Sequence, residues 1–336
     1  MSTPRFVTAF LGLVLALVAC SPAPSVTPST GPSGSPSDLR PVRLLLGFQP
    51  DVQFAPFYLA QQNGLFADAG LDVSIEYSDD VIRLVADGQS EFGVADATDV
   101  MIGRTAGIPI SYVSTLYGHF PVALIGAPDV VPADPSGLAG KRIGTPGRFG
   151  SSWHALLALL DAGGLTEDDV TIREYPQFNQ VDGLLNGDVD LITGFRANEP
   201  LRLEAQGFET ALMTVDEFAP LPGPGVVVGD ELLGADADMV HAFAAAVVAA
   251  QAQIAGDPDA GVEAAIVEVP TIAEDRETAL AVLEATIEAW GSPRSGAIDT
   301  DVWQAGYQTM QRLGFIDGSV PLEDMFDPTV MPDEAG

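Results

Sequence analysis

The sequence predicts an α/β protein made of two related lobes, and two observations lead to this prediction. Strand-like and helix-like runs alternate from residue 42 onward, which is the pattern of βαβ units and of a largely parallel sheet. In addition, residues 84–96 have the same plan as residues 183–194. In each segment, a helix end is followed by a glycine, two residues, an acidic residue, a short strand and a polar tip. An α/β fold with an internal repeat accounts for both features.

The first βαβ unit is readable at residues 42–77. Residues 42–46 form an apolar strand that ends at a glycine, and residues 56–66 place apolar side chains at helical spacing. Residues 71–77 then alternate apolar and polar side chains, which is typical of a strand with one buried face.

The repeat is precise in its spacing. Gly88 stands three positions before Glu91, and Gly187 stands three positions before Asp190. Because each copy continues into a short strand and then a new helix, we expect the two copies to occupy equivalent places in two lobes.

The two lobes need not be contiguous in the sequence. The proline-rich residues 214–225 resemble a connection that returns to the first lobe, and an apolar strand follows at residues 226–228. We predict that lobe one comprises residues 41–124 plus 223–336 and that lobe two comprises residues 125–222. Further helices, predicted to cover lobe one, are expected at residues 237–255, 276–289 and 301–313. The alternative is two consecutive domains divided near residue 130.

The N-terminus predicts an exported chain. Residues 1–19 carry one positive charge and then an apolar run shorter than a membrane span, as in a signal peptide. Cys20 is the only cysteine, and the sequence Leu-Val-Ala-Cys that ends there resembles the lipobox of bacterial lipoproteins. Residues 20–40, rich in Ser, Pro and Gly, predict a lipid-anchored linker. The expected location is the outer face of the bacterial cytoplasmic membrane, with the lipid as the only anchor; the alternative is a lone buried thiol.

The charge balance argues against nucleic-acid binding. Asp and Glu number 47 against 14 Lys and Arg, for a net charge of −33, and such a surface repels phosphate backbones. The acidic residues are spread along the chain, as on a solvated face, and we expect a monomer.

Ligands of open parallel sheets bind beyond the carboxyl ends of the strands. The loops expected there combine aromatic rings with hydrogen-bonding groups, which suits a flat ligand with polar edges. The candidate ligand-binding residues are Phe48, Gln49, Asp51, Asp96, Tyr117, Phe149, Ser151, Asn198 and Glu199.

Plainer roles stay open for several of these residues. Asp96 and Asn198 are also suited to capping helices, and residues 147–152 are suited to hold an anion at a helix start, although they lack the ending of a phosphate-binding loop. The three histidines, at 119, 154 and 241, have no metal-binding spacing. We expect neither a metal nor a cofactor.

Four segments resemble a known family. Residues 47–73 (GFQPDVQFAPFYLAQQNGLFADAGLDV), 88–96 (GQSEFGVAD), 138–152 (LAGKRIGTPGRFGSS) and 186–200 (NGDVDLITGFRANEP) are similar to bacterial solute-binding proteins grouped with thiamine-pyrimidine synthase. That group also includes taurine, alkanesulfonate and riboflavin binders. The resemblance implies the type II, Venus-flytrap periplasmic-binding-protein fold, with the ligand in the cleft between the lobes. It also implies delivery of a small solute to an ABC permease and its ATPase.

The resemblance also suggests a ligand class. In the pyrimidine-binding branch, a glutamate after the lobe-two strand pairs with the aminopyrimidine edge, and Glu199 beside Asn198 matches it. A thiamine pyrimidine precursor is therefore the first expectation, and a flavin-like vitamin such as riboflavin is the second. A sulfonate is disfavoured because Glu199 would repel an anion.

Two other classes remain. The family has a pyrimidine-synthesising enzyme branch, which uses a lysine-bound pyridoxal phosphate and a histidine; here the sole lysine, Lys141, begins a lobe-two strand, and residues 53–56 contain no histidine. We therefore predict a binding protein and not an enzyme. A sensor that passes its ligand to a signalling partner is the other alternative.

Overall fold

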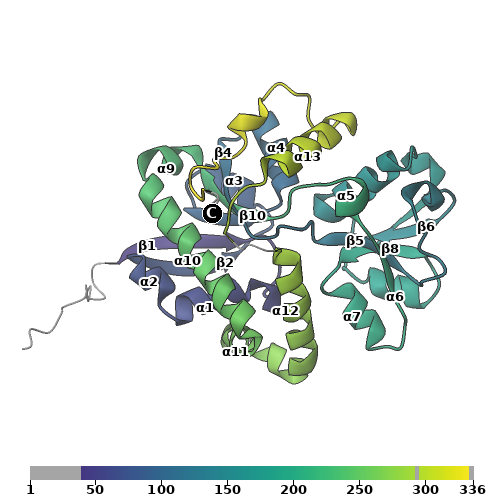
Figure 1. The fold of residues 1–336 in the computed structure, drawn as a ribbon, viewed down its shortest axis with the longest axis horizontal. Coiled ribbons are helices and arrows are strands. Elements are labelled where there is room, and N and C mark those ends of the chain that lie inside the picture. Colours follow the sequence, from purple (N-terminus) through teal and green to yellow (C-terminus); the bar gives the residue numbers. More distant parts are fainter. Residues whose placement is uncertain (1–38, 292–294, 333–336) are drawn as a thin grey trace, which may run out of the picture.

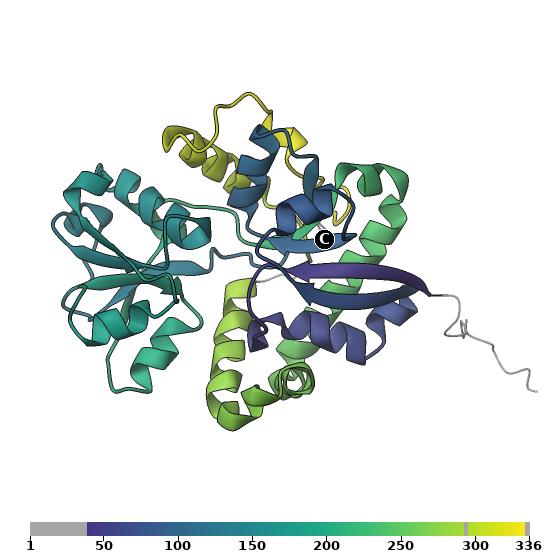
Figure 2. The same ribbon diagram turned by 180° about the vertical axis from the view of Figure 1, so that it is seen from behind.

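A computed structural model describes residues 39–291 and 295–332 of the chain. The predicted signal peptide, Cys20 and nearly all of the predicted linker lie outside the described residues. Within them, the chain forms two lobes that lie side by side, each with a five-stranded sheet (Figures 1 and 2). We call the part around the first sheet lobe one and the part around the second sheet lobe two.

The sheet of lobe one has the strand order β2-β1-β3-β10-β4. Its strands are β1 (Arg40–Leu46), β2 (Leu71–Tyr77), β3 (Phe92–Ala95), β4 (Ile110–Thr115) and β10 (Gly225–Gly229). β1 runs parallel to β2 and β3, whereas β10 is antiparallel to β3 and β4. Because β10 pairs with strands formed more than 100 positions earlier, the chain returns to lobe one after lobe two is formed.

The sheet of lobe two repeats this plan with the order β7-β6-β8-β5-β9. Its strands are β5 (Val122–Gly126), β6 (Arg142–Thr145), β7 (Thr171–Glu174), β8 (Leu191–Phe195) and β9 (Ala211–Thr214). β6 is parallel to β7 and β8, and β5 is antiparallel to β8 and β9. The expectation of largely parallel sheets is confirmed, because four of the five strands in each sheet run in one direction. The exceptions are β5 and β10, which each start at the connection between the lobes and run away from it. The lobe boundaries inferred from the sequence stay a prediction.

Helices cover both faces of the lobe-one sheet. They are α1 (Ala55–Gln62), α2 (Leu65–Asp68), α3 (Val81–Ala86), α4 (Ala97–Thr105), α9 (Asp230–Ala235), α10 (Ala237–Gly256), α11 (Pro258–Glu268), α12 (Arg276–Trp290) and α13 (Thr300–Arg312). On one face, Phe243 of α10 stacks between Phe66 and Phe92, with ring centroids 5.1 and 3.8 Å away. On the other, Trp303 of α13 packs edge-on against Tyr112 of β4, at 5.0 Å.

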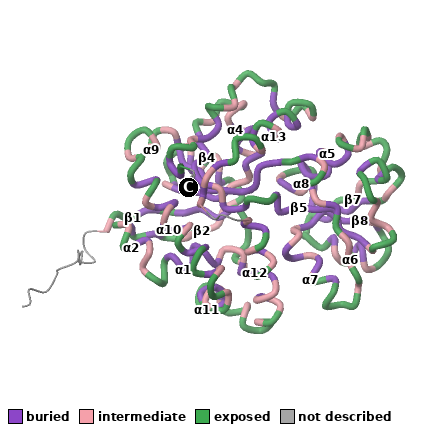
Figure 3. Tube along the Cα trace, viewed as in Figure 1, coloured by how far each residue is buried: buried purple, intermediate pink, exposed green. Residues whose placement is uncertain are grey.

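Lobe two has a smaller, mainly aliphatic core. Its helices are α5 (Gly150–Ala162), α6 (Gln180–Leu185), α7 (Glu199–Glu204) and α8 (Val215–Phe218). Leu156, Leu159 and Leu191 are fully buried in the cluster that α5 forms with the sheet. In both lobes the inner strands of the sheet are mostly buried and the outer helix faces are exposed (Figure 3).

Helix α10 is the one helix of the described ranges that is long and apolar enough, by length and composition, to cross a membrane. The most apolar 18-residue stretch of this helix has a mean hydropathy of 1.4, and half of that stretch is buried in the protein. Phe243, Val247 and Ile254 on its inner face belong to the lobe-one core. The helix therefore serves as a core helix of lobe one.

Short 3₁₀ turns complete the chain. They are η1 (Val52–Phe54), η2 (Pro135–Leu138), η3 (Glu167–Asp169), η4 (Pro270–Asp275) and η5 (Leu322–Asp324). The helices predicted after residue 230 agree with α10, α12 and α13 to within one residue, whereas α11 was not predicted. The helix expected at residues 56–66 is two helices, because Gly64 adopts a left-handed backbone with φ +76° between them.

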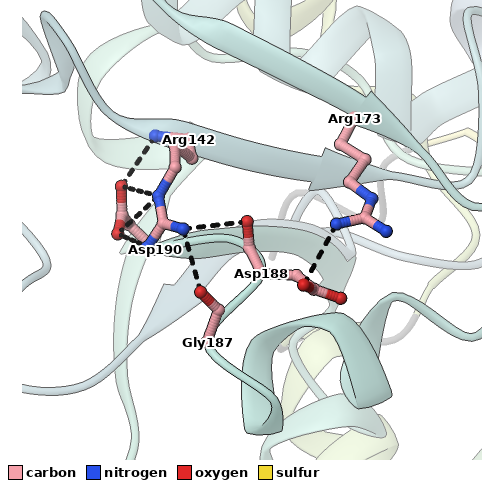
Figure 4. A network of polar contacts seen from close by, with 5 residues as sticks. All are labelled: Arg142, Arg173, Gly187, Asp188 and Asp190. Carbon is pink, nitrogen blue, oxygen red and sulfur yellow. Dashed lines mark hydrogen bonds and ion pairs between the residues drawn. The ribbon is translucent and has the colours of Figure 1, made fainter.

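The sequence repeat corresponds to an arginine clamp in each lobe. In lobe two, the Arg142 backbone N–H donates to Asp190 Oδ2 at 2.8 Å, and its guanidinium donates to Asp190 Oδ1 and to the Gly187 and Asp188 carbonyls (Figure 4). In lobe one, the Arg43 N–H donates to Glu91 Oε2 at 2.7 Å and its guanidinium to the Gln89 carbonyl. The acidic residue of each repeat thus ties the turn before β3 or β8 to the neighbouring strand.

Two connections, residues 116–121 and 219–224, join the lobes (Figure 1). The N–H groups of Leu116 and Tyr117 both donate to the Pro224 carbonyl, at 3.1 and 3.2 Å. The chain therefore enters and leaves lobe two through one hydrogen-bonded point, which we call the hinge.

Candidate functional site

The loops at the carboxyl ends of β1 and β3 contact those that follow β6, β7 and β8 in the other lobe. Asp96, directly after β3, accepts a hydrogen bond from the Ser151 N–H of α5 at 3.3 Å. Phe48, in the loop after β1, contacts Phe178, in the loop after β7. The sequence-predicted site residues Phe48, Asp96 and Ser151 therefore lie at the interface between the lobes.

Buried polar groups line the α4–α5 side of this interface. His154 Nδ1 is 2.9 Å from Thr98 Oγ1 and 3.9 Å from the Asp99 carboxylate across the lobes. Burial raises the pKa of Asp96, and burial together with the charge of Asp96 raises the pKa of Asp99 to about 7. Burial lowers the pKa of His154 to about 4. At neutral pH the histidine is therefore uncharged and does not neutralise the two carboxyl groups.

A second group of charges lies between the loop after β1 and α7. Burial raises the pKa of Asp51 in lobe one and of Glu199 in lobe two, and the Arg202 guanidinium of α7 opposes both shifts. The Asp51 charge also adds to the burial that raises the pKa of Tyr117 at the hinge. Asp51, Tyr117, Glu199 and Arg202 thus share one electrostatic environment, built from both lobes and the hinge.

The local roles of these residues differ from simple helix capping. Asp51 does cap η1, because its Oδ1 accepts the Gln53 N–H at 3.2 Å. Asp96 and Asn198 occupy the N-cap positions of α4 and α7, but neither side chain makes the capping hydrogen bond. Glu199 turns back so that its Oε2 accepts the Phe195 N–H at 2.7 Å.

The aromatic candidates divide into a contacting pair and an isolated ring. The Phe48 and Phe178 rings are 5.7 Å apart at 75°, an edge-to-face contact between the lobes, and their side chains are 42% and 43% exposed. Phe149 is 59% exposed, and its ring lies against Gly147. Gln49 is exposed in the loop beside Phe48.

Phe178 has an unusual backbone. Its φ of +55° is the one positive value at a non-glycine position in the described ranges. A left-handed conformation costs a residue with a Cβ roughly 1–2 kcal/mol. The Phe178 N–H donates to the Tyr175 carbonyl at 2.9 Å, which fixes the turn that carries the ring. Such strain in a loop at an interface is a mark of functional positions.

Gln180, the first residue of α6, is 2% exposed. Its Nε2 donates to the Thr193 carbonyl at 3.4 Å, while Oε1 has no hydrogen-bond partner among residues 39–291 and 295–332. Buried acceptors are normally satisfied, so the lack of a partner for this atom calls for an explanation.

A cavity of about 470 Å³ borders the hinge. Tyr117 is the one predicted site residue in its lining, together with Gln251, Trp290 and Trp303. The lining also includes Gly291 and Ser295, which flank residues 292–294 outside the described ranges. No binding site is assigned to this cavity.

Two arginines in the loops of lobe two, Arg148 and Arg196, pair with carboxylates. Arg148 pairs with Glu167 and Glu174 and lies over the Trp153 ring, and Arg196 pairs with Asp216 at 3.1 Å. Both guanidinium groups are therefore committed to carboxylates, which makes a strong sulfonate site less favourable.

The metal-binding residue types and the sole lysine can be located in the described ranges. Within the described ranges, no group of three His, Cys, Asp or Glu side chains is arranged to hold a metal ion. Lys141 precedes β6 at its amino end, whereas Asp96, Ser151 and Glu199 follow the carboxyl ends of strands. The sole lysine is thus at the opposite edge of the lobe-two sheet.

Sequence reasoning missed Phe178, Gln180 and Arg202. The first two lie in the Tyr-Pro-Gln-Phe-Asn-Gln segment between β7 and α6, where an aromatic residue in a proline-containing loop after a strand was the available signal. Arg202 is one turn into α7, and its relation to Asp51 depends on the packing of the two lobes.

Comparisons with known proteins agree with this architecture. The model of the NMT1/THI5-like family matches residues 51–261. The riboflavin-binding protein RibY of Chloroflexus aurantiacus is 30% identical over 305 residues, covering 88% of this chain and 87% of that protein. The formylaminopyrimidine-binding protein of Halalkalibacterium halodurans is 23% identical, covering 86% and 90%.

Solved structures give the fold. The alkanesulfonate-binding protein SsuA of Xanthomonas axonopodis pv. citri, bound to MOPS, has a TM-score of 0.65 at 16% sequence identity. The match covers 85% of this chain and 98% of that one. The two-lobed α/β architecture is therefore the periplasmic-binding-protein fold, as expected from the sequence.

Proposed function

This chain belongs to the NMT1/THI5-like family, and we propose that it is a solute-binding protein for a flavin-like vitamin, riboflavin first. The observation that carries the proposal is the similarity to a riboflavin-binding protein, 30% identical over 88% of this chain. A similarity of this length spans both lobes.

The site chemistry supports a flat heteroaromatic ligand. Phe48 and Phe178 offer phenyl rings from opposite lobes, and stacking on such rings favours flat π-systems. Buried groups with free hydrogen-bonding capacity, Asn198 and Gln180 among them, suit the carbonyl and N–H edge of an isoalloxazine ring. Gln49, Asp51, Asp96 and Ser151 would supply further polar contacts at the rim.

A thiamine pyrimidine precursor is the second candidate. Glu199 lies beside Asn198, and burial raises its pKa, so its carboxyl group is suited to pair with an aminopyrimidine edge. The formylaminopyrimidine-binding relative covers nearly the same length of chain. This candidate was the first expectation from the sequence; the higher identity to the riboflavin binder reverses the order.

The proposed mechanism is capture by closure of the lobes about the hinge. Interlobe contacts such as Asp96 to Ser151 form only when the lobes meet, so a ligand that bridges them stabilises the closed form. We propose delivery to an ABC permease and its ATPase from the outer face of the membrane, with Cys20 as the lipid-anchored residue. No catalytic step is proposed.

Titration of the protein lacking residues 1–20 with riboflavin tests the proposal. We expect quenching of flavin fluorescence on binding and a rise in melting temperature with riboflavin concentration. Formylaminopyrimidine, taurine and pyridoxal phosphate are parallel arms. A rise with formylaminopyrimidine alone favours the second candidate, a rise with taurine alone contradicts both, and a lysine adduct absent in Lys141→Arg favours the enzyme class.

A further inference from the structure

Residues 175–180, from the end of β7 to the first residue of α6, combine two features that no role in the fold explains. Phe178 has a left-handed backbone, and Gln180, two positions later, has a buried acceptor without a partner. We propose that Phe178 and Gln180 form the lobe-two side of the ligand site. Phe178 would cover one face of a flat heteroaromatic ring, and Gln180 Oε1 would accept a hydrogen bond from a ring N–H. This inference rests on the proposed function.

The packing of Phe178 points to a ligand and not to the core. The side chain is 43% exposed, and its aromatic contact is with Phe48 of the other lobe. Burial within lobe two therefore does not compensate for the left-handed backbone. The Tyr175–Phe178 turn holds the ring at the interface, where a flat ligand can replace the Phe48 ring as its partner.

The unpartnered acceptor of Gln180 has a specific cause. The ladder between β6 and β8 ends at Gly144 and Ile192, and the Gln180 Nε2 satisfies the Thr193 carbonyl just beyond that end. This hydrogen bond fixes the orientation of the Gln180 amide. Because Oε1 and Nε2 belong to one planar group, Oε1 points away from the Thr193 carbonyl.

Nearby hydroxyl groups are already committed. Thr193 Oγ1 donates to Thr145 Oγ1 at 3.1 Å, and Thr145 Oγ1 donates to the Gly147 carbonyl at 3.3 Å. Both hydroxyl hydrogens are thus used, and neither can satisfy Gln180 Oε1. An acceptor held in this way selects a ligand that brings an N–H group, as the imide of an isoalloxazine does.

The Phe178→Gly variant separates a ligand role from a structural one. Glycine relieves the left-handed strain, so we expect the ligand-free melting temperature to be equal to or above that of the wild type. The riboflavin Kd should rise by roughly tenfold, as for the loss of one stacking ring. Phe178→Asn, which also tolerates this backbone, should behave alike. A lower melting temperature in both variants, or an unchanged Kd, would overturn the role of Phe178.

Leu212→Ala is the matched control for exposed apolar surface in the same lobe. Leu212 lies on β9 and is 38% exposed, close to the exposure of Phe178. We expect its riboflavin Kd to equal that of the wild type. An equal loss of affinity in Leu212→Ala and Phe178→Gly would show a nonspecific effect and overturn the inference.

Gln180 is tested by a comparison of two ligands. Gln180→Met keeps the length of the side chain but removes the acceptor, and Gln180→Glu keeps an acceptor oxygen. Wild-type protein should prefer riboflavin over its N3-methyl derivative by roughly tenfold or more, because methylation removes the N–H. Gln180→Met should lose this preference and Gln180→Glu should retain it. A preference preserved in Gln180→Met would overturn the assignment.

Failure of the proposed function gives a different result. Wild-type protein that binds neither riboflavin nor formylaminopyrimidine overturns the proposed function. Wild-type binding with unchanged affinity in Phe178→Gly and unchanged ligand preference in Gln180→Met overturns only the inference about this segment.

Discussion

Lobe one and lobe two share a scaffold and differ in almost everything that surrounds it. The equivalent strands of the two sheets lie in the same order, and in both sheets an arginine on the strand between two parallel neighbours clamps the turn that precedes the next strand. Figure 4 shows this clamp in lobe two. Lobe one adds a stacked aromatic core under its C-terminal helices, whereas lobe two has an aliphatic core. The repeat therefore accounts for the scaffold. The chemistry of the site depends on the loops after the strands, which differ between the two lobes.

Those loops contribute complementary groups. Lobe one provides carboxyl groups, at Asp51 and Asp96, whereas lobe two provides an N–H donor at Ser151 and the guanidinium of Arg202 beside the carboxyl group of Glu199. Each lobe offers one phenyl ring. The asymmetry indicates that a ligand would be recognised by closure of both halves, since neither lobe alone carries the full set.

The largest expected effect concerns the cores. Phe243→Ala removes the central ring of the lobe-one stack, which is fully buried, and should lower the free energy of unfolding by about 3–5 kcal/mol. Urea unfolding measures it. Leu159→Ala in α5 is the lobe-two counterpart, with an expected loss of about 2–4 kcal/mol. A Phe243→Ala loss below about 2 kcal/mol would contradict a closely packed aromatic stack.

The two clamps should differ in strength. Asp190 receives both the backbone N–H and the guanidinium of Arg142, and this pairing lowers the pKa of Asp190. Glu91 receives the Arg43 N–H, while the Arg43 guanidinium pairs with Glu76 at 3.1 Å. We expect Asp190→Ala to cost about 1–2 kcal/mol and Glu91→Ala about 0.5–1 kcal/mol in urea unfolding.

The dependence of stability on acid pH is a second test of the clamp in lobe two. Because the folded pKa of Asp190 lies below its ordinary value of 3.8, its stabilisation is complete above that value and is lost as pH falls through the lowered pKa. Asp190→Asn should remove this part of the acid sensitivity. Equal acid sensitivity in the wild type and in Asp190→Asn would show that the clamp has no ionic component.

A smaller effect is expected at the interface between the lobes. The pKa of Asp99 is raised from 3.8 to about 7, so its ionisation makes the folded, closed protein less stable as pH rises through that interval. Asp99→Asn should therefore raise the melting temperature more at pH 8 than at pH 5. The pKa of His154 is lowered from 6.5 to about 4, so stability falls as pH falls through that range, and His154→Gln should reduce that fall.

Asp96 should stay unchanged in these variants, because its charge contributes to the raised pKa of Asp99. Asp168→Asn, at an exposed position of η3, is the control for loss of one negative charge. A pH profile of Asp99→Asn that is parallel to that of the wild type would contradict the coupling.

The smallest effect concerns an ion pair between α13 and lobe two. Arg312 Nε lies 3.1 Å from Asp161 Oδ2, with both side chains partly exposed. Arg312→Ala should cost less than about 1 kcal/mol and raise the riboflavin Kd slightly, with the difference disappearing at high salt. Arg276→Ala, whose pairs with Asp259 and Glu263 lie within lobe one, should leave the Kd unchanged. A Kd shift in Arg276→Ala of equal size would remove the link to closure.

The sequence was sufficient for the parts of the fold that depend on local patterns. Apolar periodicity predicted α10, α12 and α13 and the strands of the first βαβ unit, and the glycine-to-acid spacing predicted the equivalent turns at Glu91 and Asp190. The arginine partners of those acids were not predicted, because Arg43 and Arg142 are 48 positions away from them and meet them only through sheet pairing.

The directions of β5 and β10 and the missed site residues could not be predicted from local patterns, for physical reasons. The antiparallel pairing of β5 and β10 depends on where the chain crosses between lobes, which periodicity does not encode. The left-handed backbone of Phe178 follows from a turn that propensities assign to glycine or asparagine. The free acceptor of Gln180 is visible only when its neighbours' hydrogen bonds are counted.

The position of β10 has a consequence for how the chain folds during synthesis. β10 lies between β3 and β4, yet it emerges from the ribosome after all five strands of lobe two. Lobe two can therefore complete its sheet while β3 and β4 still have unpaired edges, which are hazards for aggregation. The order of translation thus makes the sheet of lobe two, in the middle of the sequence, the first that can close, whereas the sheet of lobe one stays incomplete until β10 has been made.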